Sequence, residues 1–271
     1  MTDAAGGLFS RVASRDNALV KRLRALSRPG AAYRKHGVFW IAGEHLCSAA
    51  VARGVDLEVA VFAESFWPQT DAGWAHQART LARKCVVMPD ALIAELSGLE
   101  SAARIGFLID LPALSVPRPG VASVVLDRVQ DAGNVGSILR SACAFGFGQV
   151  LALRGTAGLW SSKVLRAAMG AHFGLQLIEG LQPSDISALG LPLIVTSSHQ
   201  GQWLQQQNLP WPCAWAFGHE GQGLCDELLS AAERGVRIAQ PGGEESLNVA
   251  AAAAICLHAS AIAQARERGP R

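Results

Sequence analysis

The chain has 271 residues, of which 50% are hydrophobic and 17% are charged. This composition excludes a disordered chain, a collagen-like fibre and a disulfide scaffold, and the length suits two domains of ordinary size. The formal net charge of +2 indicates no class of partner, but the charge is unevenly distributed. The segment from Arg11 to Lys35 contains eight basic residues and one acidic residue, Asp16.

Residues 1–111 predict a small α/β domain. A basic helix is expected from Asn17 to Ser27, with Leu19, Leu23 and Leu26 on one stripe. Further helices are expected within Glu44 to Arg53 and Gly73 to Arg83. The expected strands are Val38 to Ile41, Leu57 to Phe62, Cys85 to Met88 and Ile105 to Ile109.

A proline-rich stretch, residues 112–120, is neither a good helix nor a good strand and is interpreted as a linker. Residues 121–266 then alternate strands with helices, as parallel sheets with crossover helices do. The expected strands are Val121 to Asp127, Gln149 to Leu153, Leu175 to Ile178, Leu193 to Ser197, Cys213 to Phe217 and Gly235 to Ala239. An alanine-rich helix from Leu247 to Arg266 is predicted to be buried, and residues 267–271 form a tail.

The six cysteines are scattered, without a CxxC pair or histidines at zinc-finger spacing. We interpret them as small buried side chains in a reducing compartment and predict no metal site. No apolar signal segment opens the sequence, and its longest apolar run, Val249 to Leu257, is far shorter than the ~20 residues of a membrane span. We therefore expect a cytoplasmic protein that does not contact a membrane.

Three polar loops follow predicted strands of the second domain, where open α/β sheets bind ligands. In the first, residues 126–146, Asn134 stands between two glycines as a candidate helix N-cap, and Arg140 lies in the second helical turn. Without further context, Asn134 could equally be a residue of the turn with no other role, and Arg140 could equally be an ordinary surface charge.

The second loop, residues 216–224, has the glycine spacing G-x-x-G-x-G. This spacing matches neither the dinucleotide fingerprint nor a P-loop, so a Rossmann dehydrogenase and a P-loop NTPase are rejected. By themselves, His219 and Glu220 are solvent-facing loop residues. In the third stretch, residues 237–259, Ser246 is by default the N-cap of the last helix, where unpaired amides suit a polar or anionic ligand.

The order of these elements resembles the SpoU/TrmH family of RNA ribose 2'-O-methyltransferases. The family's Asn-x-Gly-x-x-x-Arg element corresponds to Asn134 with Arg140, its FGxEGxG element to residues 217–223, and its SLNV element to residues 246–249. The resemblance covers about residues 121–265. The patterns SRDNALVKRLRAL and GVFWIAGEHL also make the N-terminal domain similar to the L30e-like substrate-binding domain of many members.

The resemblance implies a parallel sheet with a deep trefoil knot, which pattern reasoning alone never proposes because knots are rare. It also implies that S-adenosylmethionine binds in the knot and that two copies form a homodimer through this domain. The implied cofactor-binding residues are Thr196, Gly218, Ile238 and Leu247. The implied catalytic set is Arg140, acting on the 2'-hydroxyl, with Asn134, Glu220, Ser246 and Asn248 as orienting residues.

The role of Arg140 and the detailed geometry of the loops stay open. A guanidinium is effectively always protonated, so Arg140 acts either as a base with unusual help or as a fixed charge that stabilises the developing alkoxide and the neighbouring phosphate. The loops also depart from the family pattern, with Ala132 in place of a common proline and Ala239-Gln240 in place of a frequent Pro-Met. Neither change removes a side chain that the chemistry needs.

The basic N-terminal segment is consistent with an RNA partner, since lysine and arginine bind phosphates without sequence choice. The candidate RNA-binding residues are Lys21, Arg22, Arg24, Arg28, Arg34 and Lys35. The alternative is a helix with a solvated basic face. Because the added domain resembles those of ribosomal-RNA enzymes, we favour ribosomal RNA over transfer RNA. A knotted RNA-binding protein without catalysis and a base-nitrogen methyltransferase are the remaining alternatives.

Overall fold

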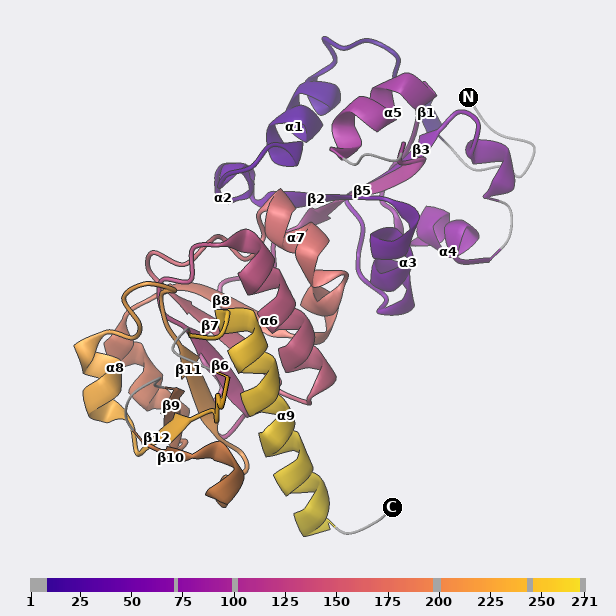
Figure 1. The fold of residues 1–271 in the computed structure, drawn as a ribbon. Helices are drawn as coiled ribbons and strands as arrows, with labels where there is room; N and C mark the ends of the chain where they lie inside the picture. The colour runs from indigo at the N-terminus through magenta and orange to yellow at the C-terminus, as the bar shows by residue number, and fades with distance from the viewer. Residues whose placement is uncertain (1–8, 71–72, 99–101, 197–200, 243–245, 269–271) are drawn as a thin grey trace. The chain divides into compact units, whose positions relative to one another are not determined.

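The computed structural model describes residues 9–70, 73–98, 102–196, 201–242 and 246–268. The chain divides into two compact units (Figure 1). Unit 1 contains Met1–Ala113 together with Trp160–Phe173, and unit 2 contains Leu114–Leu159 and Gly174–Arg271. The first division falls within the predicted linker. Trp160–Phe173, which the sequence analysis assigns to the second domain, belongs by its contacts to unit 1.

Unit 1 is built on a five-stranded sheet in the order β1-β4-β3-β5-β2. Its strands are β1 (Phe9–Arg11), β2 (Val38–Ala42), β3 (Val59–Ala63), β4 (Cys85–Met88) and β5 (Ile105–Asp110). The alternation of strands and helices along the chain is typical of parallel pairing, and β1, β4 and β3 are parallel, but β5 runs antiparallel to both its neighbours, β3 and β2. β2 is buried along its whole length, which gives it the continuous apolar run typical of a parallel strand.

Most of the helices of unit 1 pack on this sheet. The helices are α1 (Ala18–Ser27), α2 (Ala32–His36), α3 (Glu44–Ala52), α4 (Gly73–Leu81), α5 (Asp90–Ser97) and α7 (Ser162–Ala168), with the short 3-10 helices η1 (Trp67–Gln69) and η2 (Ala171–Gly174). α1 begins as predicted, because the Asn17 side chain accepts a hydrogen bond from the Leu19 N–H. Its buried stripe is Val20, Leu23 and Leu26, so Val20 takes the place expected for Leu19.

Unit 2 is built on a seven-stranded sheet in the order β10-β12-β9-β11-β6-β7-β8, and its strand pairs are all parallel, as predicted. The strands are β6 (Ser123–Leu126), β7 (Gln149–Leu153), β8 (Gln176–Leu181), β9 (Leu193–Thr196), β10 (Gln202–Trp203), β11 (Ala214–Phe217) and β12 (Arg234–Arg237). The helices are α6 (Ala132–Ala144), α8 (Asp226–Ala231) and α9 (Val249–Arg268), with η3 (Pro183–Leu189) and η4 (Leu204–Gln206). Ser197, the predicted end of one strand, lies outside the described residues.

Alternation along β11 divides the core of unit 2 into two layers. Ala214 and Ala216 pack in an apolar cluster with residues of η3 and α8. Trp215 points to the opposite face, where its Nε1 donates a hydrogen bond of 2.9 Å to the buried Ser260 hydroxyl of α9. α9 lies against α6 on this face of the sheet (Figure 1). The central strand is therefore covered on both sides.

The prediction that α9 is buried is wrong for much of the helix, since only 22% of Val249–Arg266 is buried. Ala253, Cys256 and Leu257 are buried, but Ile255 and Ile262 are exposed. The alanine-rich sequence gives apolar side chains to every face, so composition alone does not separate the packed stripe from the open one. By length and composition, Val249–Arg266 also meets the criterion for a membrane span, as the core helices of soluble proteins do.

Candidate active site

A cavity of about 310 Å³ lies in unit 2 at the carboxyl ends of β9, β11 and β12, where the N-terminus of α9 meets them. Its lining residues are Thr196, Gly218, His219, Glu220, Gly223, Leu224, Ile238, Gln240, Ser246, Leu247, Asn248, Val249 and Ala252. These include all four predicted cofactor-binding residues and three of the predicted catalytic residues. The volume is at the lower end of the roughly 300–1,000 Å³ typical of small-molecule sites.

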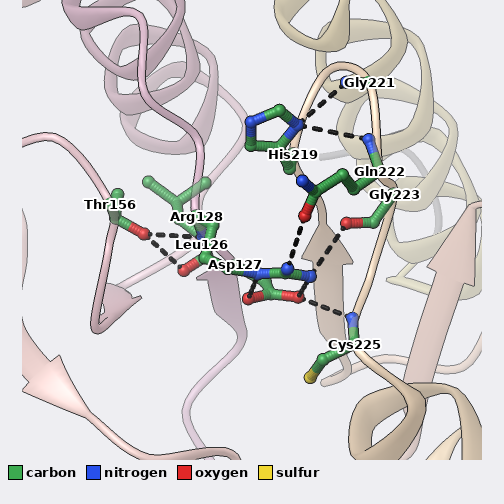
Figure 2. A network of polar contacts seen from close by, with 9 residues as sticks. All are labelled: Leu126, Asp127, Arg128, Thr156, His219, Gly221, Gln222, Gly223 and Cys225. Carbon is green, nitrogen blue, oxygen red and sulfur yellow. Dashed lines mark hydrogen bonds and ion pairs between the residues drawn. The ribbon is translucent and has the colours of Figure 1, made fainter.

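One wall of the cavity is a closed loop that follows β11. His219 and Gly223 exchange backbone hydrogen bonds of 3.0 and 2.8 Å, which closes the loop like a hairpin. Inside it, the Nδ1 atom of His219 accepts the N–H groups of Gly221 and Gln222 at 2.9 and 3.2 Å (Figure 2). A side chain at Gly218 would overlap the backbone of Gly223, so only glycine fits at the base of the loop.

The Asn134 side chain joins the first loop to the other two. Its Nδ2 donates to Glu220 Oε1 at 3.0 Å, and its Oδ1 accepts from Asn248 Nδ2 at 2.9 Å. Asn248 in turn accepts the N–H groups of Ala250 and Ala251 at the start of α9. The Glu220 carboxylate and the Asn134 and Asn248 amides thus form one chain of hydrogen bonds. Because the carboxylate can only accept, it orients the Asn134 amide, which in turn orients the Asn248 amide.

Two predicted helix caps are wrong. α6 begins two residues before Asn134 and is capped by Asp131, whose Oδ1 accepts the Asn134 N–H at 2.8 Å. α9 begins at Val249 and is capped by Asn248 rather than Ser246. In both cases a second good capping residue stands within three positions of the predicted one, and propensity does not choose between them. The side chains of Asn134 and Ser246 are therefore not used as helix caps and are available to the site.

Glu220 is a hydrogen-bond acceptor in this arrangement. Burial opposes its ionisation, but hydrogen bonds from Asn134 and from the backbone at Gln130 and Asp131 outweigh burial and lower the pKa of Glu220. The carboxyl is thus a carboxylate at neutral pH. It can orient the Asn134 amide, and it is unsuited to donate a proton.

Arg140 stands apart from these residues. It lies on α6 and is exposed, and it does not line the cavity. Its side chain forms neither a hydrogen bond nor an ion pair with the described residues. The structure of a single chain therefore brings eight of the nine predicted cofactor-binding and catalytic residues together and leaves Arg140 outside.

The predicted RNA-binding residues divide into two groups. Lys21, Arg22 and Arg24 form ion pairs with Asp16, Glu58 and Glu95, at 3.2, 2.7 and 3.0 Å respectively. Their positive charge is compensated locally, which the count of basic residues did not show. Arg34 lies over the Tyr33 ring, with its guanidinium carbon 5.3 Å from the ring centre. Arg28 and Lys35 are exposed, without an acidic partner in the described part of the chain.

A polar network that was not predicted from the sequence follows β6 and contacts the same loop (Figure 2). Asp127 is buried and pairs with the next residue, Arg128, whose φ of 58° is left-handed. Such a conformation costs a non-glycine residue roughly 1–3 kcal/mol. Burial opposes ionisation of Asp127, but the hydrogen bonds from Arg128 and the Cys225 N–H outweigh it and lower the pKa of Asp127. The signal in the sequence was a pair of opposite charges directly after an apolar strand.

Comparison with known proteins identifies the family. The SpoU rRNA Methylase family matches residues 122–258. An uncharacterised tRNA/rRNA methyltransferase of Synechocystis sp. is 30% identical, over 92% of this chain and 93% of the relative. The 23S rRNA (guanosine(2553)-2'-O)-methyltransferase RlmP of Bacillus subtilis is 29% identical, over 83% of this chain and 88% of the relative.

A solved structure shows the same fold. It is the SpoU methyltransferase AviRb of Streptomyces viridochromogenes in complex with AdoMet, which is 24% identical and has a TM-score of 0.80. The alignment covers 94% of this chain and all of that one. With the three ordered loops gathered around one cavity, these likenesses establish that the chain belongs to the SpoU rRNA methylase family.

Proposed function

We propose that the protein transfers a methyl group from S-adenosylmethionine to a ribose 2'-hydroxyl in structured RNA, and that the RNA is ribosomal. The observation that carries the proposal is the cavity lined by Thr196, Gly218, Ile238 and Leu247, with the Glu220–Asn134–Asn248 chain at its edge. The relative RlmP, which is similar over most of the chain, is named as a 23S rRNA 2'-O-methyltransferase.

The residues present suit the cofactor. Ile238 and Leu247 give the cavity apolar surface for a flat ring, and Ser246 and the carbonyls and amides near Gly218 give it polar groups. When bound, S-adenosylmethionine supplies an activated methyl group. The protein then has to align the ribose hydroxyl with that methyl and stabilise the charge that develops on the oxygen.

In this proposal the orienting work belongs to the hydrogen-bonded chain. The Glu220 carboxylate holds the Asn134 amide, which fixes the Asn248 side chain and with it the start of α9. Ser246, on the cavity wall, orients the substrate. Arg140 acts as a fixed positive charge toward the alkoxide and the neighbouring phosphate, because a guanidinium is a poor base.

The larger assembly is also proposed. Unit 1 is an L30e-like RNA-binding domain, and unit 2 is a methyltransferase domain closed by a trefoil knot. Two copies pair through unit 2, which is supported by the exposed apolar Ile255 and Ile262 of α9. Arg140 is exposed on the neighbouring helix α6, so a second copy would meet it there. The protein acts in the cytoplasm, in keeping with its six free cysteines.

The RNA surface of unit 1 is proposed to centre on Arg28, Arg34 and Lys35. Arg28 and Lys35 are exposed, and their charges are not offset by described acidic residues. Lys21, Arg22 and Arg24 contribute less in this proposal, because binding a phosphate with them means exchanging an existing ion pair.

The proposal is tested by transfer of labelled methyl from S-adenosylmethionine to total RNA from a strain that lacks this gene, followed by nuclease digestion and mapping. One 2'-O-methylated nucleotide in ribosomal RNA is the expected result. A label in transfer RNA would overturn the choice of RNA, and a label on a base would overturn the reaction. Cofactor binding without incorporation into free RNA or assembling subunits would indicate a binding protein.

A further inference from the structure

The side chain of Arg128 uses all three of its guanidinium nitrogens (Figure 2). Nε and Nη2 donate to the two carboxylate oxygens of Asp127, at 2.9 and 3.1 Å. Nη1 donates to the Gln222 side-chain oxygen at 3.0 Å, and Nη2 also reaches the Gly223 carbonyl oxygen at 3.4 Å. One guanidinium therefore ties the end of β6 to the far side of the loop that closes the cavity.

Asp127 contacts the chain just beyond the same loop. Its Oδ2 accepts the Cys225 N–H at 2.7 Å, and its two oxygens also accept from Arg128. The loop is thus held at Gln222 and Gly223 by the arginine and at Cys225 by the aspartate. His219 completes the arrangement from inside the loop, where its Nδ1 atom accepts two backbone N–H groups.

Neighbouring residues hold the backbone of Arg128 in place and leave room for its side chain. Its own N–H donates to Thr156 Oγ1 at 3.0 Å, and that hydroxyl donates to the Leu126 carbonyl at 2.9 Å. Gly155 leaves room for the arginine, since a Cβ there would lie 3.0 Å from the Arg128 Cγ. A glycine at position 128 would adopt the left-handed conformation without strain. Strain accepted at an arginine points to a role for its side chain.

We propose that Arg128, held in place by Asp127, is a positioning residue that fixes residues Gly218–Gly223 in the shape that binds S-adenosylmethionine. This inference rests on the proposed function, because it takes the cavity to be the cofactor site. Arg128 itself does not line the cavity, whereas Gly218, His219 and Gly223 do. It therefore acts through the loop, by holding it in the shape that binds the cofactor.

The test compares Arg128→Gly with Arg128→Lys by titrating each full-length variant with S-adenosylmethionine in a calorimeter. Glycine removes the fork, which releases the loop, and it relieves the backbone strain. Because the buried Asp127 carboxylate loses its cation, circular dichroism checks that the variant is folded before the titration. We expect its Kd for S-adenosylmethionine to rise about tenfold or more, because the loop must then be ordered on binding. Lysine keeps the charge but lacks the planar fork that pairs with both oxygens of Asp127 while reaching Gln222, so it recovers little of the affinity.

Arg118→Ala is the matched control. Arg118 is an exposed arginine of the same unit that donates to the Gly148 carbonyl, away from the loop. It should bind S-adenosylmethionine like the wild type. Two further readouts separate positioning from general destabilisation: low-millimolar guanidinium should restore affinity to Arg128→Gly, and the KM for the cofactor should rise more than kcat falls.

The outcomes are distinguishable. A wild-type protein that does not bind S-adenosylmethionine overturns the proposed function itself. A wild type that binds, with Arg128→Gly within about twofold of it, overturns the positioning role. If Arg128→Gly does not fold, Gln222→Ala decides, because it removes one contact of the fork and leaves Asp127 paired. An affinity unchanged by Gln222→Ala and by Arg128→Lys would then overturn the inference.

Discussion

At the scale of single residues, Asn134 and Arg140 have different structural roles although both belong to the first loop and α6. Asn134 is bonded on both sides, to Glu220 and Asn248, while Arg140 is exposed. We expect Asn134→Ala and Arg140→Ala each to lower kcat by about 100-fold or more, through misalignment and through loss of fixed charge respectively. Affinity for S-adenosylmethionine should change little in Arg140→Ala, since Arg140 neither lines the cavity nor bonds to a residue that does.

Ser137→Ala serves as the control for both variants, because Ser137 is an exposed residue of the same helix. Single-turnover methylation and calorimetric cofactor binding, measured on the same preparations, check the prediction. Near-wild-type turnover by Arg140→Ala would show that the reaction does not use this residue. Near-wild-type turnover by Asn134→Ala would show that the hydrogen-bonded chain has no part in alignment.

Asp127 predicts a dependence of stability on acid pH. Its pKa is lowered in the folded protein, so its ionised form stabilises the fold above its unfolded pKa of about 3.9. This contribution is lost as pH falls through the lower folded pKa. In urea unfolding, Asp127→Asn should therefore be about 2 kcal/mol less stable than the wild type at pH 7. The difference should shrink below about pH 4, and a difference that is constant with pH would contradict the assigned cause.

The site shows which residues a sequence can reveal. The glycines and polar side chains around the cavity were predicted because three loops with a known order follow three strands. Asp127 and Arg128 were not, because their importance depends on a contact with Gln222, which lies far along the chain. The caps at Asn134 and Ser246 were wrong for a local reason, since Asp131 and Asn248 compete for the same amides.

At the scale of elements, the contact between β11 and α9 includes a buried hydrogen bond between Trp215 and Ser260. Ser260→Ala would leave the Trp215 Nε1–H unpaired in a buried position, which costs about 1–3 kcal/mol. Chemical denaturation should show a lower midpoint with an unchanged slope. Ser260→Thr keeps the hydroxyl and should recover part of the loss. A Ser260→Ala variant as stable as the wild type would mean that water reaches the indole.

Most elements were placed by their apolar patterns, and Cys85–Met88 and Gln149–Leu153 agree with their predicted bounds. Direction and exposure were harder to predict. A buried antiparallel strand such as β2 has the same continuous apolar run as a parallel one. In α9, alanine is compatible with both packed and open faces, so burial had to come from the contacts with α6 and β11.

At the scale of the whole molecule, Trp160 is the anchor of the segment that returns to unit 1. It is 8% exposed, and its ring centre lies 4.6 Å from that of Phe39 on β2 and 5.2 Å from that of His172. Trp160→Ala should lower the free energy of unfolding by about 3 kcal/mol or more. Trp203→Ala is the control, because that ring is 37% exposed and its removal should cost much less. Equal effects would contradict the anchoring role.

The return of Trp160–Phe173 to unit 1 means that the backbone passes between the units at three points along the sequence. A recombination event at the proline-rich linker would transfer residues 1–113 without their final segment, and would leave Val164 and Leu165, which are buried in this structure, without their packing surface. Exchange of the first unit between relatives therefore requires two coordinated transfers. Chimaeras that exchange the first unit should be built from residues 1–113 and 160–173 of the same parent.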